Sequence, residues 1–177
     1  MNYIKDFISE NVKQYSRLSG TDMEHYPFLT NKKKGDLGEL IVSTEMQKIG
    51  CIVTPPSKYN GPYDKMIDNI ETEIKFSVCQ DEDNTFIINH VKTDIQWERF
   101  VFYGWNVFKP HQFIWCFKED MLRCWDETNW WKNQSSPEER IISSANVIKW
   151  INSPYCREIS TWTTPKKIKN PLEDFIS

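Results

Sequence analysis

The chain has 177 residues, with 22 Lys or Arg against 25 Asp or Glu, for a formal net charge of −3. This acidic balance excludes a protein that holds nucleic acid by bulk positive charge. Apolar residues make up 39% of the chain and charged residues 27%, which excludes an intrinsically disordered chain and predicts one globular domain over 1–177. The many aromatic residues indicate core packing before ligand stacking.

The five cysteines predict a reduced protein without structural disulfides. Their number is odd and no two of them have CxxC spacing, which excludes a zinc knuckle and a secreted disulfide framework. Lys5, Asp6 and Glu10 interrupt the first segment, so it is not a signal peptide, and no run of about 18 apolar residues predicts a membrane span. We therefore expect an intracellular, cytoplasmic protein, or one in the host cytoplasm if a phage or virus encodes it.

Hydrophobic periodicity predicts two helices in the first 50 residues. Apolar residues at helical spacing indicate an amphipathic helix over 2–18, and Gly20 and Pro27 mark a loop over 19–30. A second helix is expected over 31–49, with Gly50 at its carboxyl end.

A run of strands should follow. The pattern predicts a short strand over 51–54, then a hairpin with strands at 63–67 and 71–78 joined by a turn at Asp68 and Asn69. Further strands are expected at 86–88, 99–103 and 112–117, with Gly104 and Pro110 in the loop between the last two.

The last third of the chain predicts further helix. Residues 118–131 should begin as a helix and continue as a loop. Ser136 and Pro137 are typical of a helix start, and the helix that follows should run through Trp150 and stop at Pro154, before a tail with one possible strand. The predicted order of two helices, a run of strands and a further helix indicates an α/β arrangement around one central sheet.

Three residues of the predicted hairpin carry the chemical signal. Alternate residues of a strand share a face, so Glu73 and Lys75 point away from the face of Ile74 and Phe76, and Asp64 can reach Glu73 from the neighbouring strand. Two adjacent carboxylates favour a hard divalent cation between them. Lys75 would then orient or deprotonate a water, or neutralise transition-state charge. The alternative is a solvated hairpin with a surface ion pair worth under about 1 kcal/mol.

Four motifs in order carry a resemblance to a known family: KGDLGE at 34–39, GCIV at 50–53, PYD at 62–64 and EIK at 73–75. Together they resemble the PD-(D/E)xK nuclease superfamily, in the branch of small restriction-like and intron-encoded endonucleases. The resemblance covers about 31–78 well, and the strands and helix after residue 99 also fit. It implies a restriction-endonuclease-like core at about 31–120, a central mixed β-sheet flanked by helices, with 2–18 and 125–177 as additions.

The resemblance also implies roles for individual residues. Asp64 matches the central metal-binding aspartate and Glu73 the second ligand, joined by the backbone carbonyl of Ile74. Lys75 matches the catalytic lysine, and Glu39 matches the acid that completes the site. The ion expected is Mg²⁺, for which Mn²⁺ can substitute. Proline stands one place earlier than in the name motif, and Asp68 is a rival to Asp64, as Asp36 and Glu45 are rivals to Glu39.

Polar residues near these motifs are candidates for nucleic-acid contacts, since cations bind phosphates and amides and imidazoles also reach base edges. The candidates are Lys32, Lys33, Lys34, Lys58, Asn60, Asn89, His90 and Lys92. Solvated surface positions are the alternative for all of them.

The resulting hypothesis is a magnesium-dependent DNA endonuclease, a type II restriction-like enzyme that cuts a specific sequence of double-stranded DNA as a homodimer. The alternatives are a homing endonuclease, a Holliday-junction resolvase or a repair nuclease of the same fold, or a non-catalytic nucleic-acid-binding module.

Overall fold

Helix α2 (Asn31–Lys48) is the first long element of the computed structural model, which describes residues 17–56, 61–79, 86–108, 110–133 and 136–162. The Thr30 side chain accepts a hydrogen bond from the Lys33 N–H at 3.3 Å, and Gly50 leaves the helix with a φ of +94°. Its buried positions, Gly38, Val42 and Met46, recur every four residues and form one face. The predicted helix is confirmed, preceded by the short 3-10 helix η1 (Tyr26–Phe28).

The predicted hairpin is also confirmed. Strand β2 (Lys65–Ile67) pairs antiparallel with β3 (Ile70–Cys79), with Ile67 opposite Ile70. The turn residues Asp68 and Asn69 have φ of 53° and 64°, the left-handed conformations that a two-residue hairpin turn requires and that Asp and Asn tolerate. The short strand β1 (Val53–Thr54) pairs with β2 on its other side.

The strands form two sheets. The larger has the order β1-β2-β3-β5-β6-β9, with β5 (Arg99–Asn106), β6 (Gln112–Phe117) and β9 (Arg157–Glu158). It is mixed, because β3 and β5 are parallel while the other neighbours are antiparallel. The smaller sheet has the order β4-β8-β7, with β4 (Ile88–Lys92), β7 (Trp131–Asn133) and β8 (Glu139–Ile142).

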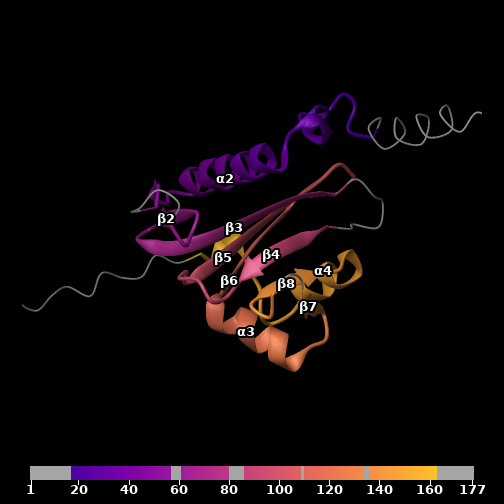
Figure 1. Ribbon diagram of the computed structural model, residues 1–177. Helices are drawn as coiled ribbons and strands as arrows, with labels where there is room; N and C mark the ends of the chain where they lie inside the picture. The colour runs from indigo at the N-terminus through magenta and orange to yellow at the C-terminus, as the bar shows by residue number, and fades with distance from the viewer. Residues whose placement is uncertain (1–16, 57–60, 80–85, 109, 134–135, 163–177) are drawn as a thin grey trace, which may run out of the picture.

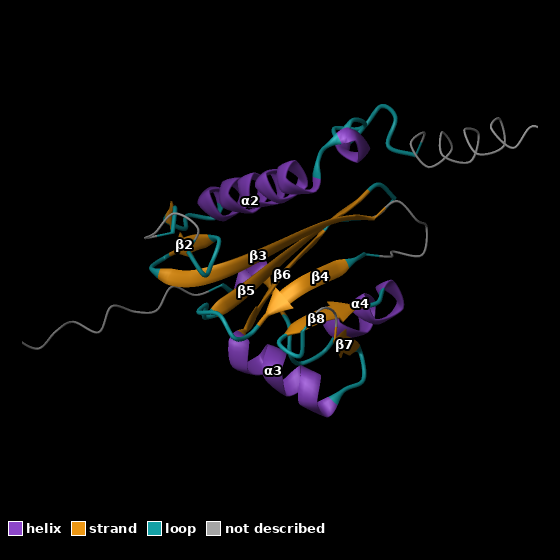
Figure 2. Ribbon diagram, viewed as in Figure 1, coloured by secondary structure: helices purple, strands orange, loops and turns teal. Residues whose placement is uncertain are grey.

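Figures 1 and 2 show how these elements are layered. Helix α2 covers one face of the curled main sheet, while the smaller sheet lies with α3 (Lys118–Glu127) and α4 (Ser144–Ile151) on the other side. Side chains of β5 alternate between two cores accordingly: Val101 packs with Val42 of α2, and Phe100 and Phe102 pack with Trp150 of α4. The last short element is the 3-10 helix η2 (Ile159–Thr161). The predicted α/β class with a central sheet and helices is thus confirmed.

The prediction that a helix begins at Ser136 is wrong. Residues Glu139–Ile142 form strand β8, and the helix begins only at Ser144, after Ser143 as N-cap. The local Ser-Pro-Glu-Glu pattern is overridden because β8 lies between β4 and β7 and satisfies its backbone there. Trp131, expected in helix or loop, begins β7 for the same reason.

Two strand boundaries also differ from the prediction. The strand expected at 86–88 begins at Ile88 and continues through Asn89, His90 and Lys92, which were expected to follow it. Gly104 lies inside β5 and not in a loop. A Cβ at Gly104 would lie 2.7 Å from the Phe86 ring, so glycine is needed there for close packing.

The five cysteines are free. In the described part of the chain, no helix has both the length and the hydropathy to cross a membrane. Residues 2–16 of the first predicted helix, and the candidate contacts Lys58 and Asn60, lie outside the described residues.

Two glycines of α2 give a matched stability prediction. A Cβ at Gly38 would meet the Phe76 Cβ at 2.3 Å, whereas a Cβ at Gly35 meets nothing within 4 Å. We expect Gly38→Ala to lower the free energy of unfolding by about 1–3 kcal/mol through overpacking. Gly35→Ala should raise it by up to about 1 kcal/mol through helix propensity. Urea denaturation of both variants checks this, and equal effects would contradict the packing of α2 on β3.

Candidate functional site

The carboxylate of Asp64 lies where the β2–β3 ladder ends. The Asp64 N–H donates to the Thr72 carbonyl at 3.1 Å, and Asp64 Oδ2 accepts from the Ile74 N–H at 2.7 Å. The side chain therefore extends the ladder by one hydrogen bond beyond β2. In an extended strand the N–H and C=O of one residue point to the same side, so the Ile74 carbonyl faces the side of Asp64.

Glu73 and Lys75 form an ion pair on the face of β3 turned toward the smaller sheet. Lys75 Nζ lies 2.7 Å from Glu73 Oε1, and the two side chains are 25% and 8% exposed. Ile74 and Phe76 pack on the opposite, α2 side, as strand alternation predicted. The alternative of a solvated surface pair is wrong, because the Glu73 carboxylate is buried.

Glu39 comes to this end of the hairpin from α2. Its Oε2 accepts from Lys65 Nζ at 2.6 Å, with both side chains partly buried. Sequence reasoning did not single out Lys65. Its position directly after Asp64 was the available signal. Neighbouring residues of an extended segment point to opposite faces, so Lys65 points away from the face of Asp64 and pairs with Glu39 of α2.

Burial and neighbouring charges together determine the electrostatics of the site. Burial, the charge of Glu73 and, less strongly, that of Glu39 raise the pKa of Asp64 to about 7, against the lowering effects of the Ile74 N–H and Lys75. Burial acts to lower the pKa of Lys75, but Glu73, Asp64 and Glu139 outweigh it and raise that pKa above its ordinary value. Lys75 is therefore an ammonium at neutral pH.

A groove of about 850 Å³ opens beside these residues. Helix α2 lines it with Lys34 and Glu39, among others, and β3 lines it from Ile74 to Val78. Asp64 lies at this wall, and Asn89 and His90 of β4 belong to the lining. The groove thus brings together the predicted carboxylate, the predicted lysine and several of the predicted contact residues. Its remaining lining residues are Arg17, Tyr26, Asn31, Gly35, Gly38, Ile87 and Ser144.

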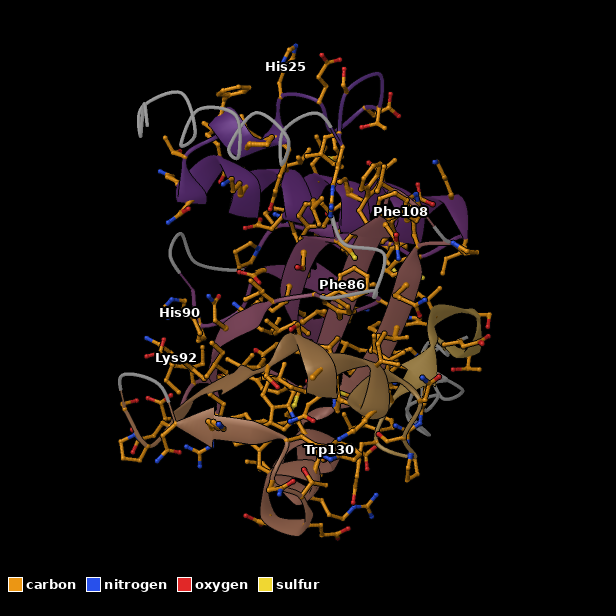
Figure 3. The ribbon with its side chains drawn as sticks, turned by 90° about the vertical axis from the view of Figure 1, so that its right-hand side faces the viewer. His25, Phe86, His90, Lys92, Phe108 and Trp130 are labelled. Atoms are coloured by element: carbon orange, nitrogen blue, oxygen red, sulfur yellow. The ribbon has the colours of Figure 1, made fainter. Side chains whose placement is uncertain are left out.

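The predicted nucleic-acid contacts divide by their relation to this groove. Lys34 lines it, with Nζ 5.2 Å from the centre of the Tyr26 ring. Lys33 is exposed and pairs with Asp36 at 2.9 Å. Lys32 and Lys92 are exposed and are not part of the lining. Figure 3 shows His90 and Lys92 near each other at one edge of the molecule, away from the buried Phe86.

The rivals to the predicted site residues have other partners. Asp68 is buried and accepts from the Ile52 N–H at 2.8 Å and from Trp162 Nε1 at 3.1 Å, so it joins the turn to the rest of the sheet. Asp36 and Glu45 form ion pairs with lysines of their own helix. None of the three lines the groove.

Glu139 is the residue of this region that sequence reasoning missed. It was expected in the first turn of a helix, but it lies in β8, buried, and its carboxylate contacts Nδ1 of His90. Its charge also acts on Lys75. A buried carboxylate needs a partner, which explains the contact. No local pattern could have revealed it, because the pairing of β8 with β4 joins residues 49 positions apart.

The oxygen donors here fit a hard divalent cation. Asp64 and Glu73 are carboxylates whose proximity is unfavourable without a cation, and the Ile74 carbonyl faces the same side as Asp64. Over the described ranges, no three His, Cys, Asp or Glu side chains group closely enough to hold a metal by themselves. Mg²⁺ commonly takes only one or two carboxylates from a protein, with water and substrate phosphate completing its shell, so the donor set is compatible with that ion.

Comparison of the chain with protein-family models, with curated proteins and with solved structures gives no match.

The crowding at Asp64 predicts a stability effect in the absence of divalent cations. The folded chain favours the protonated carboxyl, so the stabilisation is complete below the unfolded pKa of about 4 and is lost as pH rises through about 7. Asp64→Asn removes this loss and retains an oxygen acceptor for Ile74. We expect its melting temperature in EDTA to exceed the wild-type value by about 3 °C or more at about pH 8, with a smaller difference at about pH 5.

Asp36→Asn is the matched control for this measurement. Asp36 is an exposed carboxylate of α2 whose pKa is lowered by its bond to Lys33, so its substitution should give no gain at about pH 8. An Asp64→Asn variant that is no more stable than wild type at either pH would contradict the electrostatic description of the site.

Proposed function

We propose that this protein is a magnesium-dependent endonuclease that hydrolyses phosphodiester bonds in DNA. The observation that carries the proposal is the convergence of Asp64, Glu73 and Lys75 at one end of the β2–β3 hairpin, beside a groove with basic and polar walls. A buried carboxylate pair and an ammonium at the end of a groove suit the binding of a cation and a phosphate together.

A restriction-endonuclease-like core is part of this proposal. Its support is the element order: α2, which carries Glu39, then β1, the β2–β3 hairpin with the three site residues, and β5 parallel to β3 in the middle of the sheet. The same order of motifs carried the resemblance to the PD-(D/E)xK nucleases.

Each side chain of the site has a definable task under this proposal. Asp64, Glu73 and the Ile74 carbonyl would hold Mg²⁺, which supplies Lewis-acid polarisation of the phosphodiester when bound. The Ile74 N–H fixes the Asp64 carboxylate, and Glu73 fixes the Lys75 ammonium. Because its raised pKa keeps Lys75 charged, neutralisation of transition-state charge is favoured over removal of a proton from water. Lys65 positions Glu39 at the edge of the site.

The proposed substrate is double-stranded DNA, cut at a specific sequence in the manner of a type II restriction enzyme. Cutting both strands needs two such sites, so a homodimer is the proposed assembly. Homing, junction resolution and repair use the same chemistry, and a non-catalytic binding module would use the groove alone.

The decisive experiment is cleavage of long, sequence-diverse linear DNA in Mg²⁺, with EDTA as a parallel reaction. Lys75→Ala should lower the cleavage rate by about 100-fold or more, since it removes charge stabilisation at the reacting phosphate. Lys48→Ala is the matched control, because Lys48 lies in an exposed ion pair at the far end of α2. Its rate should equal that of wild type.

The products separate the alternatives. Discrete fragments that disappear in EDTA and with Lys75→Ala support a sequence-specific endonuclease, whereas a smear supports a nonspecific or repair nuclease. Cutting of branched DNA alone supports a resolvase. Equal cleavage by wild type and Lys75→Ala would refute the assigned site, and DNA binding without cleavage of any substrate would leave the binding module.

Lys34 provides a separate test of the groove as the DNA path. A lysine at a phosphate releases bound counterions, so Lys34→Ala should reduce the slope of log affinity against log salt by about 1. Lys48→Ala should leave the slope unchanged, since Lys48 is outside the groove. Fluorescence anisotropy of a labelled duplex in EDTA measures both, and equal slopes for the two variants would place the DNA elsewhere.

A further inference from the structure

Strand β4 departs from regular geometry where it lines the groove. Its register with β8 shifts between Ile88 and Val91, and His90 has a φ of 54°. The irregularity keeps Ile88 and Val91 both buried, while the two residues between them, Asn89 and His90, are both exposed and both line the groove. A regular strand would turn one of that pair toward the core. Non-glycine residues adopt this conformation at a cost in free energy, and such outliers gather at functional sites.

The Glu139 carboxylate orients the ring of His90. The Glu139 side chain is 7% exposed, and its carboxylate contacts Nδ1 of the His90 ring, which is 58% exposed. A carboxylate accepts hydrogen bonds, so Nδ1 carries the proton in this contact, and the pair settles both the tautomer and the direction of the ring.

This oriented ring lines the same groove as Asp64 and Lys75, and Glu73 pairs with Lys75 beside it without being part of the lining. The Glu139 charge acts on Lys75, so the His90–Glu139 pair is electrostatically close to these three residues although it comes from the other sheet. The two walls then offer different chemistry: carboxylates and an ammonium on the hairpin, and an imidazole with the Asn89 amide on β4. An anionic strand that lies between them would meet donors on both sides.

We propose that His90, positioned by Glu139, contacts a backbone phosphate of the nucleic acid in the groove, with a proton on each ring nitrogen in the complex, so that Nδ1–H donates to Glu139 and Nε2–H donates to the phosphate. The inference rests on the proposed nuclease function and adds to it a residue pair that binds substrate without taking part in bond cleavage. Glu139 is a positioning residue in this arrangement, because it acts through the ring.

The test separates affinity from chemistry. His90→Asn removes the ring but keeps a residue that tolerates a positive φ, so the fold of β4 is preserved. Anisotropy with a labelled DNA duplex in EDTA should show affinity weakened by about tenfold, the effect of one charge-assisted hydrogen bond. Glu139→Gln should weaken it in the same direction. The single-turnover cleavage rate in Mg²⁺ at saturating DNA should stay within about threefold of wild type for His90→Asn.

Lys92→Ala is the matched control, because it removes a positive charge from the same strand at a position outside the groove lining. The DNA affinity of the Lys92→Ala variant should fall by less than that of the His90→Asn variant. Melting temperatures of all variants show whether the fold is intact, and His90→Asn decides the outcome if Glu139→Gln does not fold.

Four results would overturn the inference. Equal DNA affinities of the His90→Asn and Lys92→Ala variants would show that His90 makes no phosphate contact. An unchanged affinity with a much lower saturating rate would make His90 a proton-transfer group instead. A wild-type protein that neither binds nor cuts DNA would refute the proposed function and this inference together, whereas wild-type cleavage with a silent His90→Asn refutes the inference alone.

Discussion

The hydrogen bond from the Ile74 N–H to the Asp64 carboxylate is the contact on which the rest of the site depends. It holds a carboxylate at the end of the hairpin ladder, next to a second carboxylate that the alternation of β3 directs away from α2. The turn at Asp68 and Asn69 sets the register that makes this bond possible. Helix α2 then brings Glu39 close, because Gly38 lets the helix approach β3 at Phe76.

Concentrating charge in this way is unfavourable for the folded chain, and the structure offsets it locally. Lys75 pairs with Glu73, Lys65 with Glu39, and His90 with Glu139, so each of these acids has a basic partner. The negative charge of Asp64 is not fully compensated, and its pKa is raised because burial and the charge of Glu73 outweigh the Ile74 N–H and Lys75. Repulsion between the Asp64 and Glu73 carboxylates remains, and His90 keeps a left-handed backbone conformation. Both features are typical of a site that is arranged for binding and not for stability.

The smaller sheet gives the groove its second wall. Strand β8 lies between β4 and β7, and its carboxylate Glu139 reaches His90 across the β4–β8 pair. The aromatic residues support this layer, as Trp150 of α4 packs edge to face on Phe100 of β5 and on Trp131 of β7. The aromatic residues of the described chain divide between this core and the core on the α2 side of the main sheet, so packing explains much of their abundance.

Local pattern determined the parts of this protein whose interactions are short in sequence. Helix α2 with its Gly50 end, the β2–β3 hairpin, β6 to the residue, and the shared face of Glu73 and Lys75 all follow from periodicity and turn chemistry. The start of α4, the strand at Glu139–Ile142 and the place of Gly104 did not follow, because pairing between distant strands and contact with Phe86 outweigh local preference. Only the tertiary structure decided that Lys65 holds Glu39 and Glu139 holds His90, since each pair joins residues far apart in the chain.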